Sequence, residues 1–240
     1  MYLYLYDSIL REKPHAQKLK SIENRLTDIG ITGKIVRLTA FNDARSIITD
    51  ELKRSVKTVV IVGNDKTLSG VIASSANMPV VFGFIPVEAS MFGALLGIEP
   101  CAAACDVMSA RKTESLDIGF MNGRYFLGAV EIPPSHIAID YDGKFHVSSK
   151  KALLGVKITN LYPYAGAAAA GIKKVSPQDG KLEAFLEPVL KKGMFGFKIE
   201  KESASVFPFS EMIITSKEPF LAVTDGRESK EIRLNIKLAP

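Results

Sequence analysis

The sequence predicts an α/β domain followed by an all-β domain. Strand and helix patterns alternate along the first hundred residues, and a β-branched apolar run stops at Gly63, where a helical pattern follows. From about Leu116 the pattern changes to short strands separated by Asn-Gly and Asp-Gly pairs. We therefore expect a Rossmann-like parallel sheet in three layers over residues 1–98, a connecting helix within 99–115, and a β-sandwich-like domain over 116–240.

Each element of the first domain has its own signal. The alternating tyrosines and leucines of residues 2–6 indicate a strand, and apolar residues at three- and four-residue spacing predict a helix over 15–29 that ends at Gly30. A second strand is expected over 34–38 and a second helix over 42–54, with Asn42 as a plausible cap. A third strand ends at Gly63 and a fourth ends at Pro86. Crossover helices of this length imply that the strands are parallel.

The turn after the third strand is the most informative segment, and its sequence is GNDKT, residues 63–67. A helix that starts directly after a strand aims its unpaired N–H groups at any ligand above the sheet, most often a phosphate. Gly63 allows close approach, Asn64 tolerates positive φ, Asp65 can hold a metal or a phosphate-bearing ligand, and Thr67 can cap the helix. The alternative interpretation is an ordinary turn in which Asp65 and Thr67 act as caps.

A second loop, VEASM at residues 87–91, follows the fourth strand and leads into a short helix that ends near Gly97. In parallel sheets, ligands bind outside the carboxyl ends of the strands. The two loops are therefore expected to be neighbours in space.

The second domain is predicted from four turn signals. These are Asn122-Gly123, Asp142-Gly143, Asp179-Gly180 and Asp225-Gly226. Polar and apolar residues alternate over 231–238, as in a half-buried antiparallel strand.

Composition excludes several classes of protein. The net charge of +5 is spread along 240 residues with no dense basic block and no Trp, so we expect no nucleic-acid partner. No apolar run approaches the ~20 residues of a membrane span, and residues 1–10 lack the basic start of a signal peptide, so we expect a soluble cytoplasmic protein. Cys101 and Cys105 lack further ligands at zinc spacing and are expected to be buried and inert. The oligomeric state is not specified.

Residues 59–72, VVIVGNDKTLSGVI, and 82–98, FGFIPVEASMFGALLGI, resemble in order and spacing the diacylglycerol kinase catalytic domain, with its GGDGT and GTGND loops. Downstream, the segment from Asn160 to Gly166, the QDG turn at 178–180 and the DGR turn at 225–227 resemble later motifs of that family. The likeness covers nearly the whole chain. Each motif departs from the usual sequence of the family motif, and the fold tolerates such departures better than activity does.

The resemblance implies an ATP- and magnesium-dependent enzyme. It places Gly63, Asn64, Asp65, Lys66, Thr67, Glu88 and Ser90 at the nucleotide, Asp65 and Asp225 in catalysis, and Asp179 in a magnesium-binding turn.

Three departures bear on activity. Lys66 replaces a glycine and either donates to phosphate or strains the turn, Glu88 adds an acid where a phosphate would lie, and Arg227 replaces a glutamate. For Asp179 and Asp225 the alternative is an ordinary turn residue.

The leading hypothesis is an ATP-dependent kinase of the diacylglycerol kinase type that phosphorylates a lipid hydroxyl. The alternatives are a relative that binds nucleotide, lipid or a protein partner without turnover, and a kinase for a soluble acceptor, similar to NAD kinases. Lysines and phenylalanines in residues 191–209 suggest transient membrane-surface contact, or else a strand core. Asp65 is expected in an exposed loop, where its replacement costs little stability.

Overall fold

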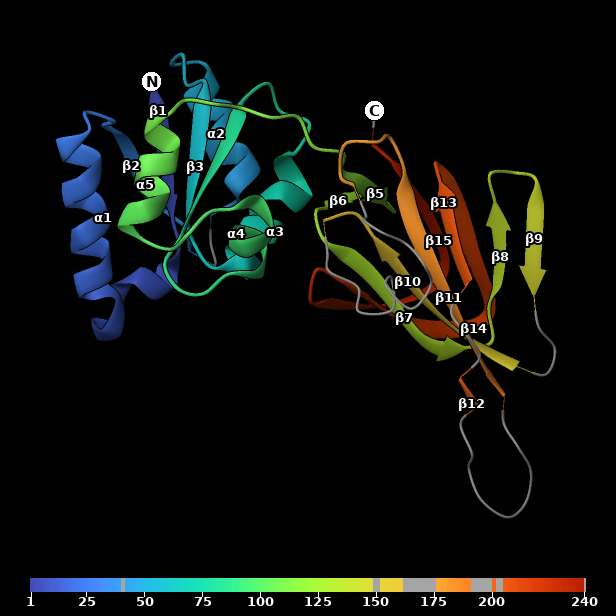
Figure 1. Cartoon of the computed structure of the whole chain (residues 1–240). Helices are drawn as coiled ribbons and strands as arrows, with labels where there is room; N and C mark the ends of the chain where they lie inside the picture. Colours follow the sequence, from blue (N-terminus) through green and yellow to red (C-terminus); the bar gives the residue numbers. More distant parts are fainter. Residues whose placement is uncertain (40–41, 149–151, 162–175, 191–199, 202–204, 240) are drawn as a thin grey trace. The chain divides into compact units, whose positions relative to one another are not determined.

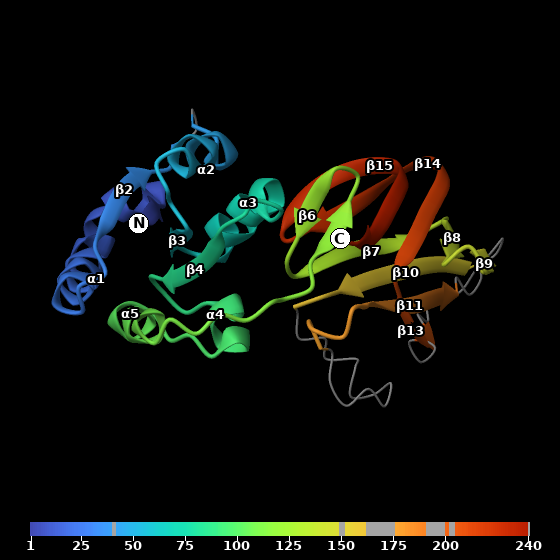
Figure 2. The same ribbon diagram turned by 90° about the horizontal axis from the view of Figure 1, so that it is seen from above.

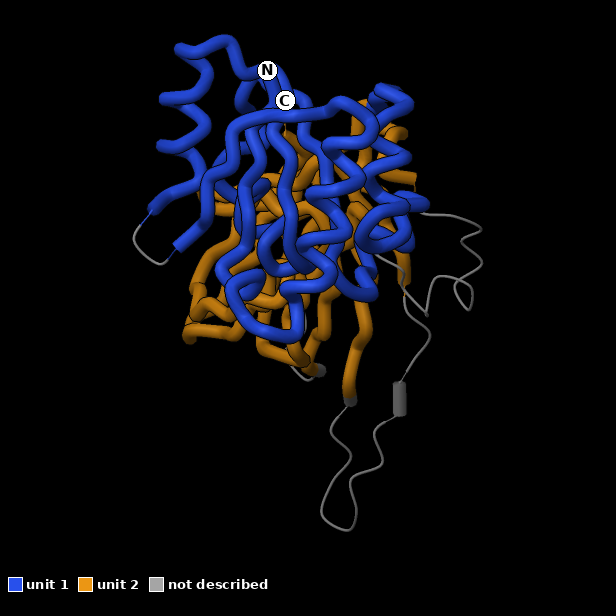
Figure 3. Tube along the Cα trace, turned by 90° about the vertical axis from the view of Figure 1, so that its left-hand side faces the viewer, with its two compact units in different colours: residues 1–114 blue, residues 115–240 orange. Residues whose placement is uncertain are grey.

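The computed structural model describes the chain except residues 40–41, 149–151, 162–175, 191–199, 202–204 and 240 (Figures 1 and 2). The chain forms two compact units, residues 1–114 and 115–240 (Figure 3). No helix in the described part of the chain is long and apolar enough to cross a membrane.

The first unit is built on a four-stranded parallel sheet in the order β2-β1-β3-β4. Its strands are β1 (Tyr2–Tyr6), β2 (Gly33–Arg37), β3 (Thr58–Gly63) and β4 (Val81–Pro86). Its helices are α1 (Ala16–Asp28), α2 (Ala44–Leu52), α3 (Asp65–Ser75), α4 (Met91–Leu96) and α5 (Ala102–Ser109), with 3-10 turns η1 (Ser8–Arg11) and η2 (Lys13–His15). This arrangement confirms the predicted α/β class, and it makes β3 an interior strand.

Helices cover both faces of this sheet (Figure 2). Tyr4 and Tyr6 of β1 pack in one cluster with Ile22 of α1 and Cys105 of α5. On the other side of the sheet, α2 and α3 pack against each other and α3 contacts β3. Strand residues alternate between the two faces, which is why runs such as Thr58–Gly63 are apolar almost throughout.

Helix α5 belongs to the first unit, although the sequence placed it in a connecting segment. Ala104 and Cys105 are completely buried in the same cluster as Tyr4. On the surface, Arg25 of α1 forms an ion pair with Asp106 at 2.5 Å. Burial raises the pKa of the Cys105 thiol to about 11, which supports the expectation of an inert cysteine.

In the second unit, the described strands form one antiparallel sheet of 11 strands. Its main path runs β12-β11-β10-β7-β14-β15-β5-β6, while β8 pairs with β14 and β9, and β13 pairs with β11. The strands are β5 (Gly119–Met121), β6 (Arg124–Phe126), β7 (Ala129–Ser135), β8 (Ala138–Tyr141), β9 (Phe145–Ser148), β10 (Ala152–Thr159), β11 (Leu182–Leu190), β12 (Glu200–Lys201), β13 (Ser205–Phe209), β14 (Glu211–Thr224) and β15 (Arg227–Leu238).

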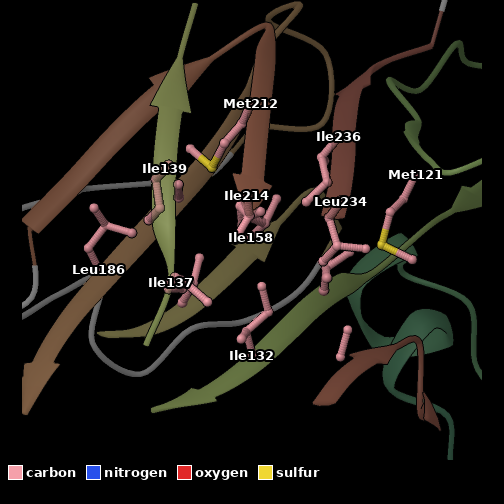
Figure 4. Packing of buried hydrophobic residues seen from close by; sticks show 14 of the residues in the cluster. Met121, Ile132, Ile137, Ile139, Ile158, Leu186, Met212, Ile214, Leu234 and Ile236 are labelled. Carbon is pink, nitrogen blue, oxygen red and sulfur yellow. The ribbon is translucent and has the colours of Figure 1, made fainter. Parts of the chain in front are cut away.

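A large apolar cluster packs inside this sheet (Figure 4). Met121 of β5 and Leu234 of β15 share the cluster with Ile158 of β10 and Leu186 of β11, which lie far from them along the sheet order. The sheet therefore curls around its own core, and one continuous hydrogen-bonded sheet makes the sandwich-like packing.

The predicted turns lie where the sequence placed them. Asn122, Asp142 and Asp225 all have positive φ, as do the glycines that follow them, which suits two-residue hairpin turns. At Asp179-Gly180 only the glycine has positive φ, and the pair precedes β11.

Candidate functional site

The turn between β3 and α3 begins at Gly63, the last residue of β3. Helix α3 starts at Asp65, earlier than the sequence pattern indicated, and Thr67 lies in its first turn. Asn64 is the cap, since its Oδ1 accepts a hydrogen bond from the Thr67 N–H at 3.1 Å. The capping role expected for Thr67 was therefore wrong. Asn64 has a φ of −109°, so the positive φ considered for it is not used either.

Asp7 is a member of this site that the sequence did not reveal. It follows β1, which pairs with β3, and only 9% of it is exposed. Its carboxylate accepts hydrogen bonds from the Thr67 hydroxyl and from the Ile9 N–H. A Cβ on Gly63 would lie 2.9 Å from the Asp7 Cβ, so this glycine is needed for the chain's own packing. The sequence signal that could have identified Asp7 is an acidic residue placed directly after a buried strand.

Asp65 joins the two loops at the carboxyl ends of β3 and β4. One of its carboxylate oxygens accepts from the Ser90 hydroxyl, and the other accepts from the Met91 N–H at 2.8 Å. Ser90 caps α4 by accepting from the Gly93 N–H at 2.7 Å. Asp65 is half-buried, is the first residue of α3 and connects α3 to α4, so the expectation that it lies in an exposed loop was wrong.

Lys66 and Glu88 are both exposed at this edge of the first unit. Lys66 is helical, so it does not strain the turn, and its ammonium can reach a ligand in solvent. Glu88 adds a negative charge to those of Asp7 and Asp65. An anionic ligand at this edge therefore meets the α3 N-terminus and Lys66 as attractive groups and three carboxylates as repulsive ones.

In the second unit, the carboxylate of Asp225 is bound by three successive backbone N–H groups. These are the N–H groups of Leu127, Gly128 and Ala129, at 2.8, 2.9 and 2.9 Å. The Asp225 N–H donates to the Ala129 carbonyl at 3.0 Å. Burial raises the pKa of Asp225, while the three N–H groups and the Arg227 guanidinium offset part of that shift.

Asp179 lies in an acidic group at the start of β11. Its Oδ1 accepts from the Lys181 N–H at 3.1 Å, and Asp117 accepts from the Gly180 N–H at 2.8 Å. Glu183 is buried, and its Oε2 has no hydrogen-bond partner among the residues that the structure describes. Burial, followed by the charge of Asp179, raises the pKa of Glu183 to about 7.

Two further oxygens near Glu183 are buried and have no hydrogen-bond partner within the described part of the chain. Thr159 lies opposite Glu183 in the β10–β11 register, and its Oγ1 is unpaired, as is the Oδ1 of the adjacent Asn160. Asn160 donates to the carbonyls of Asp117 and Leu127 at 2.7 and 3.1 Å. Residues 162–166 of the same motif lie outside the described residues.

These oxygens do not form a closed metal centre. Within the described residues, no three His, Cys, Asp or Glu side chains are placed to hold a metal ion. Magnesium often keeps several of its waters and uses only one or two carboxylates, so an ion at this acidic group would have to keep most of its waters.

Only part of the expected membrane-contact segment falls in the described residues. In β13, Phe207 is 37% exposed while Phe209 is completely buried, and Tyr141 packs against both rings. Phe195 and Phe197 lie outside the described residues.

The two units together have the two-domain fold of diacylglycerol kinases. A diacylglycerol kinase from Bacillus anthracis strain Sterne superimposes with a TM-score of 0.74 at 18% identity, over 99% of this chain and 93% of that one. Two further structures from this strain, provisionally assigned as diacylglycerol kinases, give TM-scores of 0.75 at 16% identity, over 99% of this chain and 94% of theirs. At this identity the likeness establishes the fold. No model of a known protein family and no curated protein sequence matches the chain.

The Asp65–Ser90 contact can be tested for its effect on stability. Asp65→Ala should lower the free energy of unfolding by about 1–3 kcal/mol, because it leaves the Met91 N–H and the Ser90 hydroxyl without their acceptor. A double-mutant cycle with Ser90→Ala should give a coupling of about 0.5–3 kcal/mol by urea denaturation. Lys66→Ala, at the exposed neighbour, should change stability by less than about 0.5 kcal/mol. Additive effects of the two substitutions would contradict the contact.

Glu183 should make stability fall as the pH rises. Its pKa is about 7 in the folded protein and near 4.5 in the unfolded chain, so between these values the folded state binds more protons. The contribution of this group to the free energy of unfolding is fully present below pH 4.5. It is lost as the pH rises through 7, at up to about 1.4 kcal/mol per pH unit. The free energy of unfolding of Glu183→Gln, relative to that of wild type, should rise across this pH window and become constant above it. Glu228→Gln, on the exposed start of β15, is the control, and parallel curves for wild type and Glu183→Gln would refute the assignment.

Proposed function

We propose that this protein is an ATP-dependent kinase of the diacylglycerol kinase type, which transfers the γ-phosphate to a lipid hydroxyl. The observation that supports it is the turn from β3 into α3, with a helix start capped by Asn64 at the carboxyl end of an interior parallel strand. This turn belongs to a chain whose fold is that of diacylglycerol kinases.

The first unit would bind the nucleotide. The N-terminus of α3 offers backbone N–H groups and the positive end of its dipole to a phosphate. Lys66 would add a cation in the first helical turn. Ser90 and Asp65 would act by holding the second loop against the first, because each already hydrogen-bonds across them.

Magnesium would accompany the nucleotide. Asp7, Asp65 and Glu88 place negative charge beside the turn, so free ATP is repelled, whereas a magnesium complex of ATP carries less charge. A second magnesium ion at Asp179, with Glu183 as its buried neighbour, would neutralise the acidic group at the start of β11.

The magnesium site can be tested without an activity assay. Millimolar magnesium should raise the melting temperature of the wild-type protein at pH 8, where Glu183 is deprotonated, and Asp179→Asn should remove this gain. The exposed Asp28→Asn, in the first unit, should retain it. Equal gains in all three proteins would count against Asp179 as a ligand.

One observation favours a second candidate, a relative that binds nucleotide without turnover. A general base must reach the hydroxyl whose proton it takes, but the carboxylate of Asp225 already accepts three backbone hydrogen bonds. Arg227 is a cation at the end of the same turn and cannot replace a base.

A transfer assay separates these candidates. The purified protein with magnesium and γ-labelled ATP should label the organic phase of a mixture that contains diacylglycerol in phospholipid vesicles, and it should bind ATP in calorimetric titration. Asp225→Asn, which removes a carboxylate oxygen, should lower transfer by about 10²- to 10⁴-fold if Asp225 is the base. Binding without any labelled product would favour the non-catalytic relative. If NAD is added to the same mixture, labelling of NAD and not of the lipid would instead indicate a soluble acceptor.

A further inference from the structure

The hydroxyl of Thr67 carries one proton and has two neighbouring oxygens that can only accept it. One belongs to the carboxylate of Asp7, and the other is the Oδ1 of Asn64, 3.1 Å from the Thr67 Oγ1. This Oδ1 also accepts from the Thr67 N–H, which identifies it as the oxygen of the amide. A carboxylate is the stronger acceptor of the two, so the proton points to Asp7. The lone pairs of the Thr67 oxygen are then left for a ligand.

Asp7 is held in one position from several sides. Its Oδ1 accepts from the Ile9 N–H at 3.0 Å and from the Ser8 hydroxyl at 3.3 Å. Its Oδ2 accepts from the Thr67 hydroxyl. A Cβ on Gly63 would lie 2.9 Å from the Asp7 Cβ and 3.1 Å from the Thr67 Cβ, so both side chains pack directly against this glycine. A carboxylate fixed in this way holds the hydroxyl in one orientation before any ligand binds.

A hydroxyl that has already donated its proton suits a cation better than a phosphate. Thr67 could donate to a phosphate oxygen only by giving up its hydrogen bond to Asp7. Its oxygen can, however, enter the coordination shell of a hard divalent ion such as magnesium, which prefers oxygen ligands. Threonine and serine hydroxyls at a turn from a strand into a helix hold magnesium in this way in P-loop proteins.

The other groups of the turn suit the phosphate instead. Lys66 is exposed in the first turn of α3, where the helix N-terminus also favours negative charge. Both carboxylate oxygens of Asp65 accept hydrogen bonds from the second loop, through the Ser90 hydroxyl and the Met91 N–H. The turn therefore offers positive charge at Lys66 and an acceptor oxygen, with a carboxylate behind it, at Thr67.

We propose that Asp7 is a positioning residue that orients the Thr67 hydroxyl as a ligand for the magnesium ion of a magnesium complex of ATP. The carboxylate takes the hydroxyl proton and places negative charge behind the oxygen, and both effects favour a divalent cation at Thr67. This inference rests on the proposed function for the nucleotide as the ligand. It is tested by the difference in binding between magnesium-bound and metal-free ATP and does not require transfer.

The experiment is calorimetric titration of the full-length protein with ATP, once with excess magnesium and once with EDTA. Thr67→Val, which replaces the hydroxyl with a methyl group of similar size, should weaken binding of the magnesium complex about 10-fold or more and leave that of metal-free ATP unchanged. Thr67→Ser should restore the affinity because it keeps the hydroxyl. Asp7→Asn should also weaken binding of the magnesium complex, but it should strengthen that of metal-free ATP, because it removes a negative charge beside the phosphates.

These opposite signs separate a positioning role from a structural one, because a variant that merely loosens the turn would weaken the binding of both forms of ATP. The matched controls are Thr27→Val and Asp28→Asn, which make the same two changes in exposed residues of the last turn of α1. Both controls should leave the two affinities unchanged. If Asp7→Asn fails to fold in a thermal unfolding measurement, the comparison of Thr67→Val with Thr67→Ser decides the question alone.

Four results would overturn the proposal. The first is a wild-type protein that binds neither form of ATP or shows no preference for the magnesium complex. The second is a Thr67→Val variant that keeps this preference, and the third is a Thr67→Ser variant that behaves like Thr67→Val. The fourth is a folded Asp7→Asn variant with the preference of the wild type. Failure of the kinase proposal is distinguishable, since it would appear as preferential binding of the magnesium complex without labelled lipid.

Discussion

Aspartate carboxylates that accept hydrogen bonds from backbone N–H groups hold the loops of this protein in place. Asp7 accepts from Ile9, Asp65 from Met91, Asp117 from Gly180, Asp142 from Ser210 and Glu211, and Asp225 from three successive residues. A hydrogen bond to an ionised acceptor is worth roughly twice a neutral one. Most of these contacts join segments far apart in the sequence, so each fixes a loop that its own residues could not order.

This use of aspartate bears directly on function. The same residue type serves as metal ligand, general base and turn anchor, and an anchored carboxylate has fewer free lone pairs for chemistry. Asp65 and Asp225 both anchor loops in this protein, so any catalytic contribution from them must operate alongside a structural one. Lys66, which is exposed in the first turn of α3, is better placed to meet a ligand.

Much of the fold followed from local patterns in the sequence, because strand-helix alternation and Asn-Gly or Asp-Gly turns act over short distances. The end of β3 at Gly63 and the hairpin turns at Asn122, Asp142 and Asp225 are of this kind. The roles of individual side chains were harder to predict because they depend on contacts across the fold. Nothing near Asp7 in the sequence indicates Thr67, and nothing near Asp65 indicates Ser90. Local preference alone also could not decide between Asn64 and Thr67 as the cap of α3, since both residue types cap helices well.

The strand order of the second unit has a consequence for how the chain can fold during synthesis. The first unit contains no strand from beyond residue 114, so it can form while the remainder is still being made. In the second unit, however, β14 and β15 are the last strands in sequence, yet they lie between β7 and β5 in the interior of the sheet. Until they emerge from the ribosome, β5 and β7 each present an unpaired edge to other chains. Loss of these two strands would split the sheet through its middle, not shorten it at one side.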